Sequence, residues 1–290
     1  MDALMAFAVA NAGMTETVRR TETISSQSWT VVCLSKSGRH WWFRWRTSSV
    51  FGMPSSSNAG AAWATLTDRP SQDAEVAPII EPYTSYHFFT EGTCVHAAVE
   101  MSNGAYVHMS FGDITKFGSW TGGHYFANTR TLYNDPSHYN IPDSNNHHFM
   151  FMGFDKGVVS NTQRSIMYVP YNSKNYAYIQ DSVVSGFNTV IAAGFSGGIY
   201  NRFIANSPNA FNDRTVGVPI MMYLLENASG GSNLHMPLGY VPNIRFINIR
   251  DLAPKDLVNT DWMVFPLQSK NTGLQNSYAN SGNYGWAIRK

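Results

Sequence analysis

The stretch that decides the fold is 93–126, TCVHAAVEMSNGAYVHMSFGDITKFGSWTGGHYF. Two short apolar-rich segments are joined by Asn103-Gly104, and a Gly-Ser-Trp-Thr-Gly-Gly loop then leads to a third such segment. Asn-Gly between alternating apolar residues is the strongest short-range hairpin signal, because both turn positions need positive φ. The stretch therefore predicts a β-hairpin followed by a third strand.

The same period of two recurs on either side of this stretch. Residues 29–34 and 39–46 predict a second hairpin, with Trp41, Phe43 and Trp45 on one strand face and alternate residues on the other. Alternation returns after residue 147, and no helical pattern exceeds about three turns. We expect a mainly β protein: antiparallel sheets in a β-sandwich-like architecture, with long loops and few short helices.

The chain divides near residue 80. Residues 67–82 are polar and punctuated by prolines, which is typical of a connecting segment. The expected organisation is an N-terminal arm, β-hairpin and linker over residues 1–80, followed by a main β domain over residues 81–290.

The composition favours protein contacts over nucleic acid or membrane. Charged residues are 13% of the 290, about half the usual share, and the net charge is +1. The one basic cluster, Arg39, Arg44 and Arg46, surrounds tryptophans and is better explained by an amphipathic hairpin than by a phosphate or sugar site. No nucleic-acid contact is expected without a basic patch, and no apolar run is long enough for a membrane span.

Residues 1–13, MDALMAFAVANAG, and the two cysteines allow further expectations. The segment lacks the basic start of a signal peptide, so we expect an ordered arm that docks onto a neighbouring subunit. Cys33 and Cys94 fit no zinc motif and are expected as buried free thiols, with a disulfide as the open alternative.

One segment resembles a catalytic motif. Gly194–Gly198 matches G-x-S-x-G around Ser196, and Asp213 and His235 follow it. No amphipathic helix and no His-Gly-Gly-Gly segment accompany it. A turn is therefore the preferred interpretation, and we expect no catalytic residues.

The histidines do not predict a metal site. A two-residue turn at 103–104 would pair position 102 with position 105, which turns His96 and His108 to opposite faces of the sheet. No phosphate-binding glycine loop is present, so no metal and no cofactor are expected.

Carbohydrate chemistry remains an alternative. Four acidic residues are candidates for a glycosidase pair, but the sequence does not pair them: Glu100, Asp113, Asp155 and Asp181. Exposed aromatic rings could equally stack on sugars.

Three patches carry a family resemblance. They are YVHMSFGDITKFGSWTGGHY (106–125), GYVPNIRFINIRDLAPKDLVNTDWMVFPLQSKN (239–271) and SGNYGWAIRK (281–290). Together they resemble virion structural proteins of tailed bacteriophages, of the kind encoded among tail, neck and baseplate genes. The resemblance leaves out the first 80 residues and brings no catalytic residue with it.

The resemblance implies a non-enzymatic component of a virion, assembled in the bacterial cytoplasm. Its expected partners are copies of itself and other virion proteins. The alternatives are a tail protein that contacts host-surface glycan, as a binding module or depolymerase, and a serine hydrolase acting through Ser196. The side chains expected to contact other chains are Met5, Phe7, Trp41, Trp45 and Trp120.

Overall fold

A computed structural model describes about three fifths of the chain. The described residues are 1–46, 49–55, 57–58, 60–66, 75–76, 83–102, 104–131, 147–148, 150–151, 167–168, 189–192, 215, 217–227, 233–267 and 284–290. Within them the protein is mainly β, with three large antiparallel sheets and one α-helix, which confirms the expected fold class. The predicted boundary near residue 80 stays a prediction.

The N-terminal sheet has the strand order β1-β2-β3-β4-β5. Its strands are β1 (Thr15–Ile24), β2 (Gln27–Lys36), β3 (Arg39–Arg46), β4 (Ser49–Ser55) and β5 (Glu75–Val76). The helix α1 (Asp2–Ala12) precedes it, and a short 3-10 helix, η1 (Trp63–Thr65), follows β4.

The middle sheet has the order β13-β10-β8-β7-β6 and contains the stretch that opened the sequence analysis. Its strands are β6 (Tyr83–Glu91), β7 (Cys94–Met101), β8 (Tyr106–Asp113), β10 (His124–Asn128) and β13 (Met167–Tyr168). The predicted hairpin is β7–β8, and the third predicted strand is β10 beside β8.

The C-terminal sheet has the order β14-β15-β16-β19-β18-β17, and β9 pairs with β16. Its strands are β9 (Thr115–Lys116), β14 (Thr189–Ala192), β15 (Gly217–Asn227), β16 (Asn233–Asn248), β17 (Leu257–Val258), β18 (Trp262–Pro266) and β19 (Tyr284–Arg289). A separate two-stranded ladder joins β11 (Arg130–Thr131) to β12 (His147–His148).

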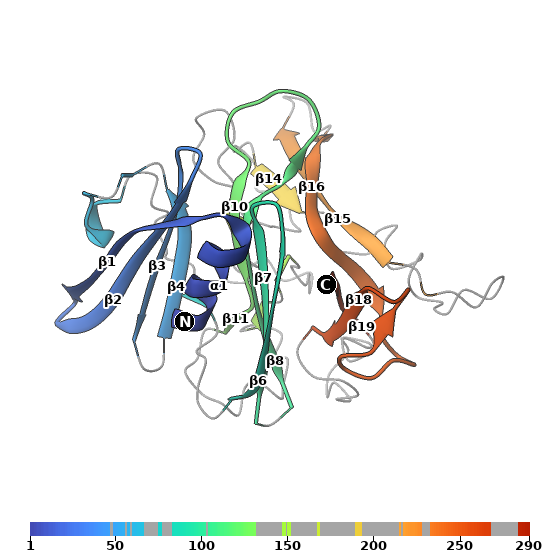
Figure 1. Ribbon diagram of the computed structural model, residues 1–290. Coiled ribbons are helices and arrows are strands. Elements are labelled where there is room, and N and C mark those ends of the chain that lie inside the picture. Colours follow the sequence, from blue (N-terminus) through green and yellow to red (C-terminus); the bar gives the residue numbers. More distant parts are fainter. Residues whose placement is uncertain are drawn as a thin grey trace.

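The three sheets stack as layers, with the middle sheet between the other two (Figure 1). One hydrophobic cluster joins α1 and the N-terminal sheet to one face of the middle sheet, and a second joins its other face to the C-terminal sheet. This explains why nearly every residue of β7, β8 and β10 is buried. The predicted sandwich therefore has a third layer.

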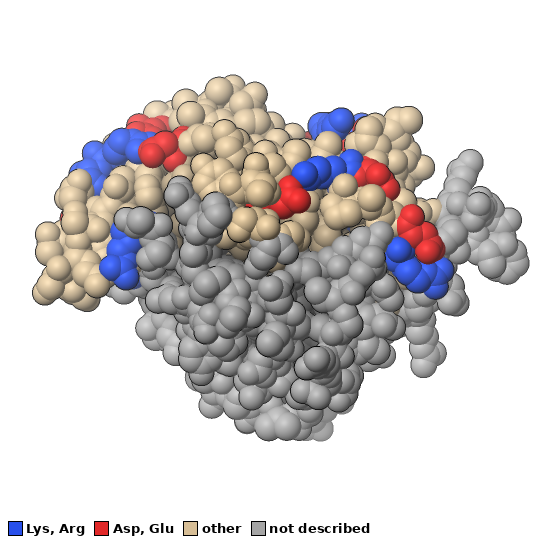
Figure 2. Space-filling model, turned by 90° about the horizontal axis from the view of Figure 1, so that it is seen from below, with Lys and Arg blue, Asp and Glu red and all other residues tan. Residues whose placement is uncertain are grey.

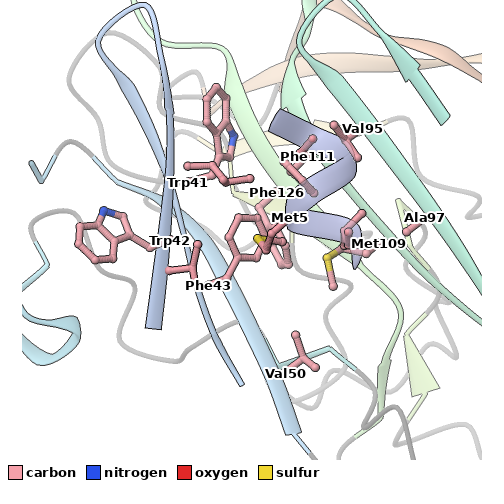
Figure 3. Packing of buried hydrophobic residues seen from close by; sticks show 14 of the residues in the cluster. Met5, Trp41, Trp42, Phe43, Val50, Val95, Ala97, Met109, Phe111 and Phe126 are labelled. Carbon is pink, nitrogen blue, oxygen red and sulfur yellow. The ribbon is translucent and has the colours of Figure 1, made fainter. Parts of the chain in front are cut away.

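The predicted faces of β3 are confirmed. Trp41 and Phe43 point toward the middle sheet, while Trp42 points away from it (Figure 3). The ring centroids of Phe43 and Phe111 lie 4.9 Å apart, and Trp41 Nε1 donates to the Tyr125 carbonyl at 3.1 Å. These contacts bind the first two layers together.

The helix α1 packs one face on its own chain, and its expected docking onto a neighbouring subunit stays a prediction. Its buried residues, Leu4, Met5, Ala8 and Ala12, recur along one helix face. The helix ends at Gly13, whose φ of 63° suits a glycine cap. Val9 lies outside this face and is 40% exposed, so only part of the apolar surface of the helix is used within the subunit.

Candidate interaction surface

A row of aromatic rings lies along β6, the edge strand of the middle sheet. Centroid distances are 6.2 Å from Tyr83 to Tyr86, 4.8 Å from Tyr86 to Phe88, and 5.5 Å from Phe88 to Phe7 of α1. Tyr83 and Tyr86 are 43% and 48% exposed, which is unusual for large rings packed in a row. We name Tyr83, Tyr86, Phe88 and Phe7 the aromatic row.

A small apolar pocket of about 90 Å³ opens beside the aromatic row. Its walls come from the start of α1, the aromatic row and the face of β7 and β8 that carries Val99 and Val107. The pocket is too small for a drug-sized ligand, for which sites of about 300–1,000 Å³ are usual. It is suited to one apolar group.

The rings of the aromatic row pack against one another, while Tyr83 and Tyr86 stay partly exposed. Tyr86 and Phe88 are stacked, with 23° between their planes, and Tyr83 and Phe7 flank them at either end. A sugar stacks on an open ring face, and the stacked pair of Tyr86 and Phe88 occupies one face of each of these two rings. The geometry favours contact with protein side chains.

The histidines required a correction of register. Met101 N donates to the Ala105 carbonyl and β7 pairs His96 with Ser110, so the connection is one residue longer than a two-residue turn. The predicted pairing of position 102 with position 105 is therefore wrong. Because a one-residue slip reverses the face, His96 and His108 lie on the same face of the sheet.

Both histidines connect the middle sheet to the C-terminal sheet. His96 Nε2 donates to the Pro242 carbonyl at 3.0 Å, and His108 Nε2 donates to the Pro266 carbonyl at 2.8 Å. Burial lowers the pKa of each histidine to about 4, so both rings are neutral at pH 7. They hold two layers together rather than a ligand.

A buried hydrogen-bond chain continues from His96. Its Nδ1 accepts from the Ser110 hydroxyl at 2.8 Å, and Ser110 lies 2.7 Å from the Tyr125 hydroxyl. Since each member is buried and paired, the chain satisfies the side-chain polar groups of His96, Ser110 and Tyr125. Among the described residues, no group of three or more His, Cys, Asp or Glu side chains is arranged to hold a metal ion.

Two of the four candidate carboxylates fall in the described part of the chain and have other partners. Glu100 pairs with Lys255 at 2.6 Å, and Asp113 pairs with Arg39. Glu100 lies beside Tyr106, seven positions before Asp113 on β8, which corresponds to roughly 20 Å at the usual rise of a strand. That exceeds the separation of a glycosidase pair. Asp155 and Asp181 lie outside the described residues.

The predicted contact residues have different positions. Met5 and Trp41 are fully buried in the chain's own core, so neither presents a surface to another chain, contrary to expectation. Trp45 packs against the same core and lies beside Arg19, whose guanidinium is 5.7 Å from its ring. Phe7 is half-buried and belongs to the aromatic row.

Trp120 is half-buried and docks onto its own C-terminal sheet. Its Nε1 donates to the Leu238 carbonyl at 3.3 Å, and Lys116 lies 4.6 Å above its ring while donating to its carbonyl. The Gly-rich loop therefore folds Trp120 back onto its subunit. Its expected contact with another chain stays a prediction.

The remaining sequence candidates have these outcomes. Cys33 and Cys94 are buried free thiols in different sheets, as expected. The motif around Ser196, with Asp213, lies outside the described residues, as does the side chain of His235. No helix in the described part is long and apolar enough to cross a membrane.

The sequence analysis missed Tyr83, Tyr86 and Phe88. The signal that could have revealed them is the segment YTSYHFFTE, which is rich in aromatic residues and has Glu91 as its sole acidic or basic residue other than histidine. No protein-family model matches this chain, and comparison with curated proteins finds no match.

Proposed function

We propose that this protein is a non-enzymatic structural component of a tailed-phage virion, in the tail, neck or baseplate. It acts through contacts with copies of itself and with other virion proteins. The observation that carries the proposal is the aromatic row on β6, the edge strand of the middle sheet among the described residues, where Tyr83 and Tyr86 are 43% and 48% exposed. Contiguous exposed rings mark surfaces that are covered in an assembly.

The sparse charge supports the same proposal. Figure 2 shows that acidic and basic side chains form a few small groups on the described part of one face, which is otherwise uncharged. With 13% charged residues in the whole chain, a free monomer would be poorly protected against association. A permanent place in an assembly resolves this difficulty.

The test is incorporation into particles. A phage that lacks its own copy of the gene is supplied with wild-type protein or with Tyr86→Lys, and purified particles are counted by infectivity and analysed by mass spectrometry. A buried unpaired charge costs at least 1–2 kcal/mol, so we expect Tyr86→Lys to reduce infectious particles by about tenfold or more.

The matched control is Thr21→Lys, an exposed position on the other edge strand, β1. It should leave the particle yield within about twofold, because surface substitutions usually change stability by less than 0.5 kcal/mol. Absence of the protein from purified particles would refute the proposed function. Equal yields from the two variants would refute the role of the aromatic row.

A further inference from the structure

The outer face of the N-terminal sheet, on the side away from the middle sheet, is covered by part of the same chain. Trp42 projects to this side (Figure 3) and is nonetheless fully buried. The covering residues are 57–58 and 60–66, which follow β4 and include η1. Trp42 Nε1 donates to the Ser57 carbonyl at 3.3 Å, so the cover lies directly on the sheet. We name these residues the clasp.

Two apolar side chains anchor the clasp. Trp63 and Leu66 are 0% and 5% exposed, whereas most of the other described clasp residues are exposed. The Arg44 guanidinium lies between two indoles, 4.6 Å from the Trp29 ring and 4.8 Å from the Trp63 ring. Cation–π contacts of this kind are attractive and become stronger when water is excluded. The ring of Trp63 therefore continues a stack that begins on the sheet itself.

Glu22, on the edge strand β1, joins the clasp to the sheet. Its Oε2 accepts from Trp63 N at 3.0 Å, and its Oε1 accepts from Arg20 Nε at 2.8 Å. Arg20 in turn donates to the Ala61 carbonyl. Because Trp63 is the first residue of η1, the carboxylate satisfies a backbone donor that the short helix leaves free. One acidic side chain thus connects β1, Arg20 and the clasp.

Three features of the closed clasp lower the free energy of its opening. Among the described residues its backbone–backbone hydrogen bonds lie within the clasp itself: Ala61 to Asn58, Thr65 to Ala62, and Leu66 to Trp63. Opening can therefore leave the strand ladders of the sheet intact. Trp63 Nε1 is buried without a hydrogen-bond partner in the described part of the chain, and the charged Arg44 is 7% exposed. Both groups regain water when the clasp opens, which offsets part of the lost apolar contact.

We propose that the clasp opens as a local unit while the three sheets stay folded, and that Glu22 holds it closed. Local openings involve segments with few buried contacts, as the clasp is outside its two anchors. Opening would uncover Trp29, Trp42 and Arg44, and tryptophan and arginine are enriched among the residues that dominate protein interfaces. The clasp therefore controls access to a surface distinct from the aromatic row. This inference does not depend on a role in the virion.

Native-state hydrogen exchange of the full chain tests the opening. The measurement uses mass spectrometry at several low concentrations of denaturant. We expect the clasp amides to exchange at a rate that hardly changes with denaturant, because a local opening exposes little surface. The amides of β2 and β3 should exchange more slowly and accelerate as the denaturant rises. If clasp and sheet amides share one rate and one denaturant dependence, the clasp does not open by itself and the inference is wrong.

A pair of variants on β1 tests the role of Glu22. Glu22→Ala removes the bonds to Trp63 N and Arg20, so it should raise the exchange rate of the clasp amides by about tenfold or more. The matched control is Glu16→Ala, because Glu16 binds Arg19 rather than the clasp. The control should leave the exchange of the clasp within about twofold. Equal rates in the two variants would show that Glu22 does not hold the clasp closed.

Tryptophan oxidation shows which face the opening uncovers. With a slow reagent that is selective for indole, the rate of modification follows the population of the open form. Trp41 and Trp42 are both fully buried but point to opposite sides of the sheet, which makes them an internal comparison (Figure 3). We expect Trp63 and Trp42 to be modified at a common rate that rises in Glu22→Ala, while Trp41 stays protected. Equal modification of Trp41 and Trp42 would indicate global unfolding and would overturn the inference.

Discussion

Acid should loosen the contact between the middle and C-terminal sheets. His96 and His108 are buried between these layers, and burial lowers the pKa of each to about 4 from an ordinary value of 6.5. The unfolded chain therefore binds these protons at a higher pH than the folded chain does. Stability is full above pH 6.5, decreases as the pH falls toward 4, and levels off below it.

The magnitude follows from the two pKa values. At pH 5 an unfolded histidine is almost fully protonated and a folded one with a pKa of about 4 is mostly neutral, so each histidine costs about 2 kcal/mol of unfolding free energy. The pair costs about 4 kcal/mol, a large share of the usual 5–15 kcal/mol. Glu100, whose burial is outweighed by its hydrogen bonds to Lys255 and Ser85 so that its pKa is lowered, loses its contribution only below about pH 4.5, outside the range between pH 7 and pH 5 that the assay compares.

The assay is denaturant unfolding followed by tryptophan fluorescence at pH 7 and pH 5. His108→Gln keeps an amide N–H for the Pro266 carbonyl but removes the titration, so its loss of stability between the two pH values should be smaller by about 2 kcal/mol. His96→Gln should behave in the same way toward Pro242. An unchanged pH dependence in both variants would show that these rings do not titrate as their burial implies.

Two further predictions concern packing and thiols. A Cβ at Gly52 would lie 2.4 Å from Phe126 Cε2, so Gly52→Ala should lower the free energy of unfolding by about 1–3 kcal/mol in denaturant unfolding. A Cβ at Gly60 would lie 3.4 Å from its nearest neighbouring atom, so the control Gly60→Ala should change the free energy by less than about 0.5 kcal/mol. Equal effects of the two substitutions would argue against close packing of the first two layers. Burial raises the pKa of the Cys94 thiol to about 12 and also raises the pKa of the Cys33 thiol. Neither thiol should therefore react with a thiol reagent until the protein is unfolded. Rapid reaction of the native protein would contradict the burial of these thiols.

The hairpin β7–β8 illustrates both the reach and the limit of sequence reasoning. Alternation around Asn103-Gly104 correctly predicted two antiparallel strands, because turn residues and the period of two are local properties. The turn length was wrong by one residue, and the pattern offered no warning, since both faces of β7 are apolar apart from His96 and Glu100. A strand that is buried on both sides carries no signal that specifies its register.

Local chemistry in the sequence by itself determined the fold class and the opposite faces of β3, whereas the structure decided between free thiols and a disulfide for Cys33 and Cys94. Only the tertiary structure decided that a third layer covers the middle sheet, that Met5 and Trp41 lie inside the subunit, and that Tyr86 lies outside it. The physical reason is that alternation specifies which residues share a face, whereas the burial of that face depends on sheets that are distant in sequence. An aromatic ring in a strand is thus core or contact surface according to its neighbours in space.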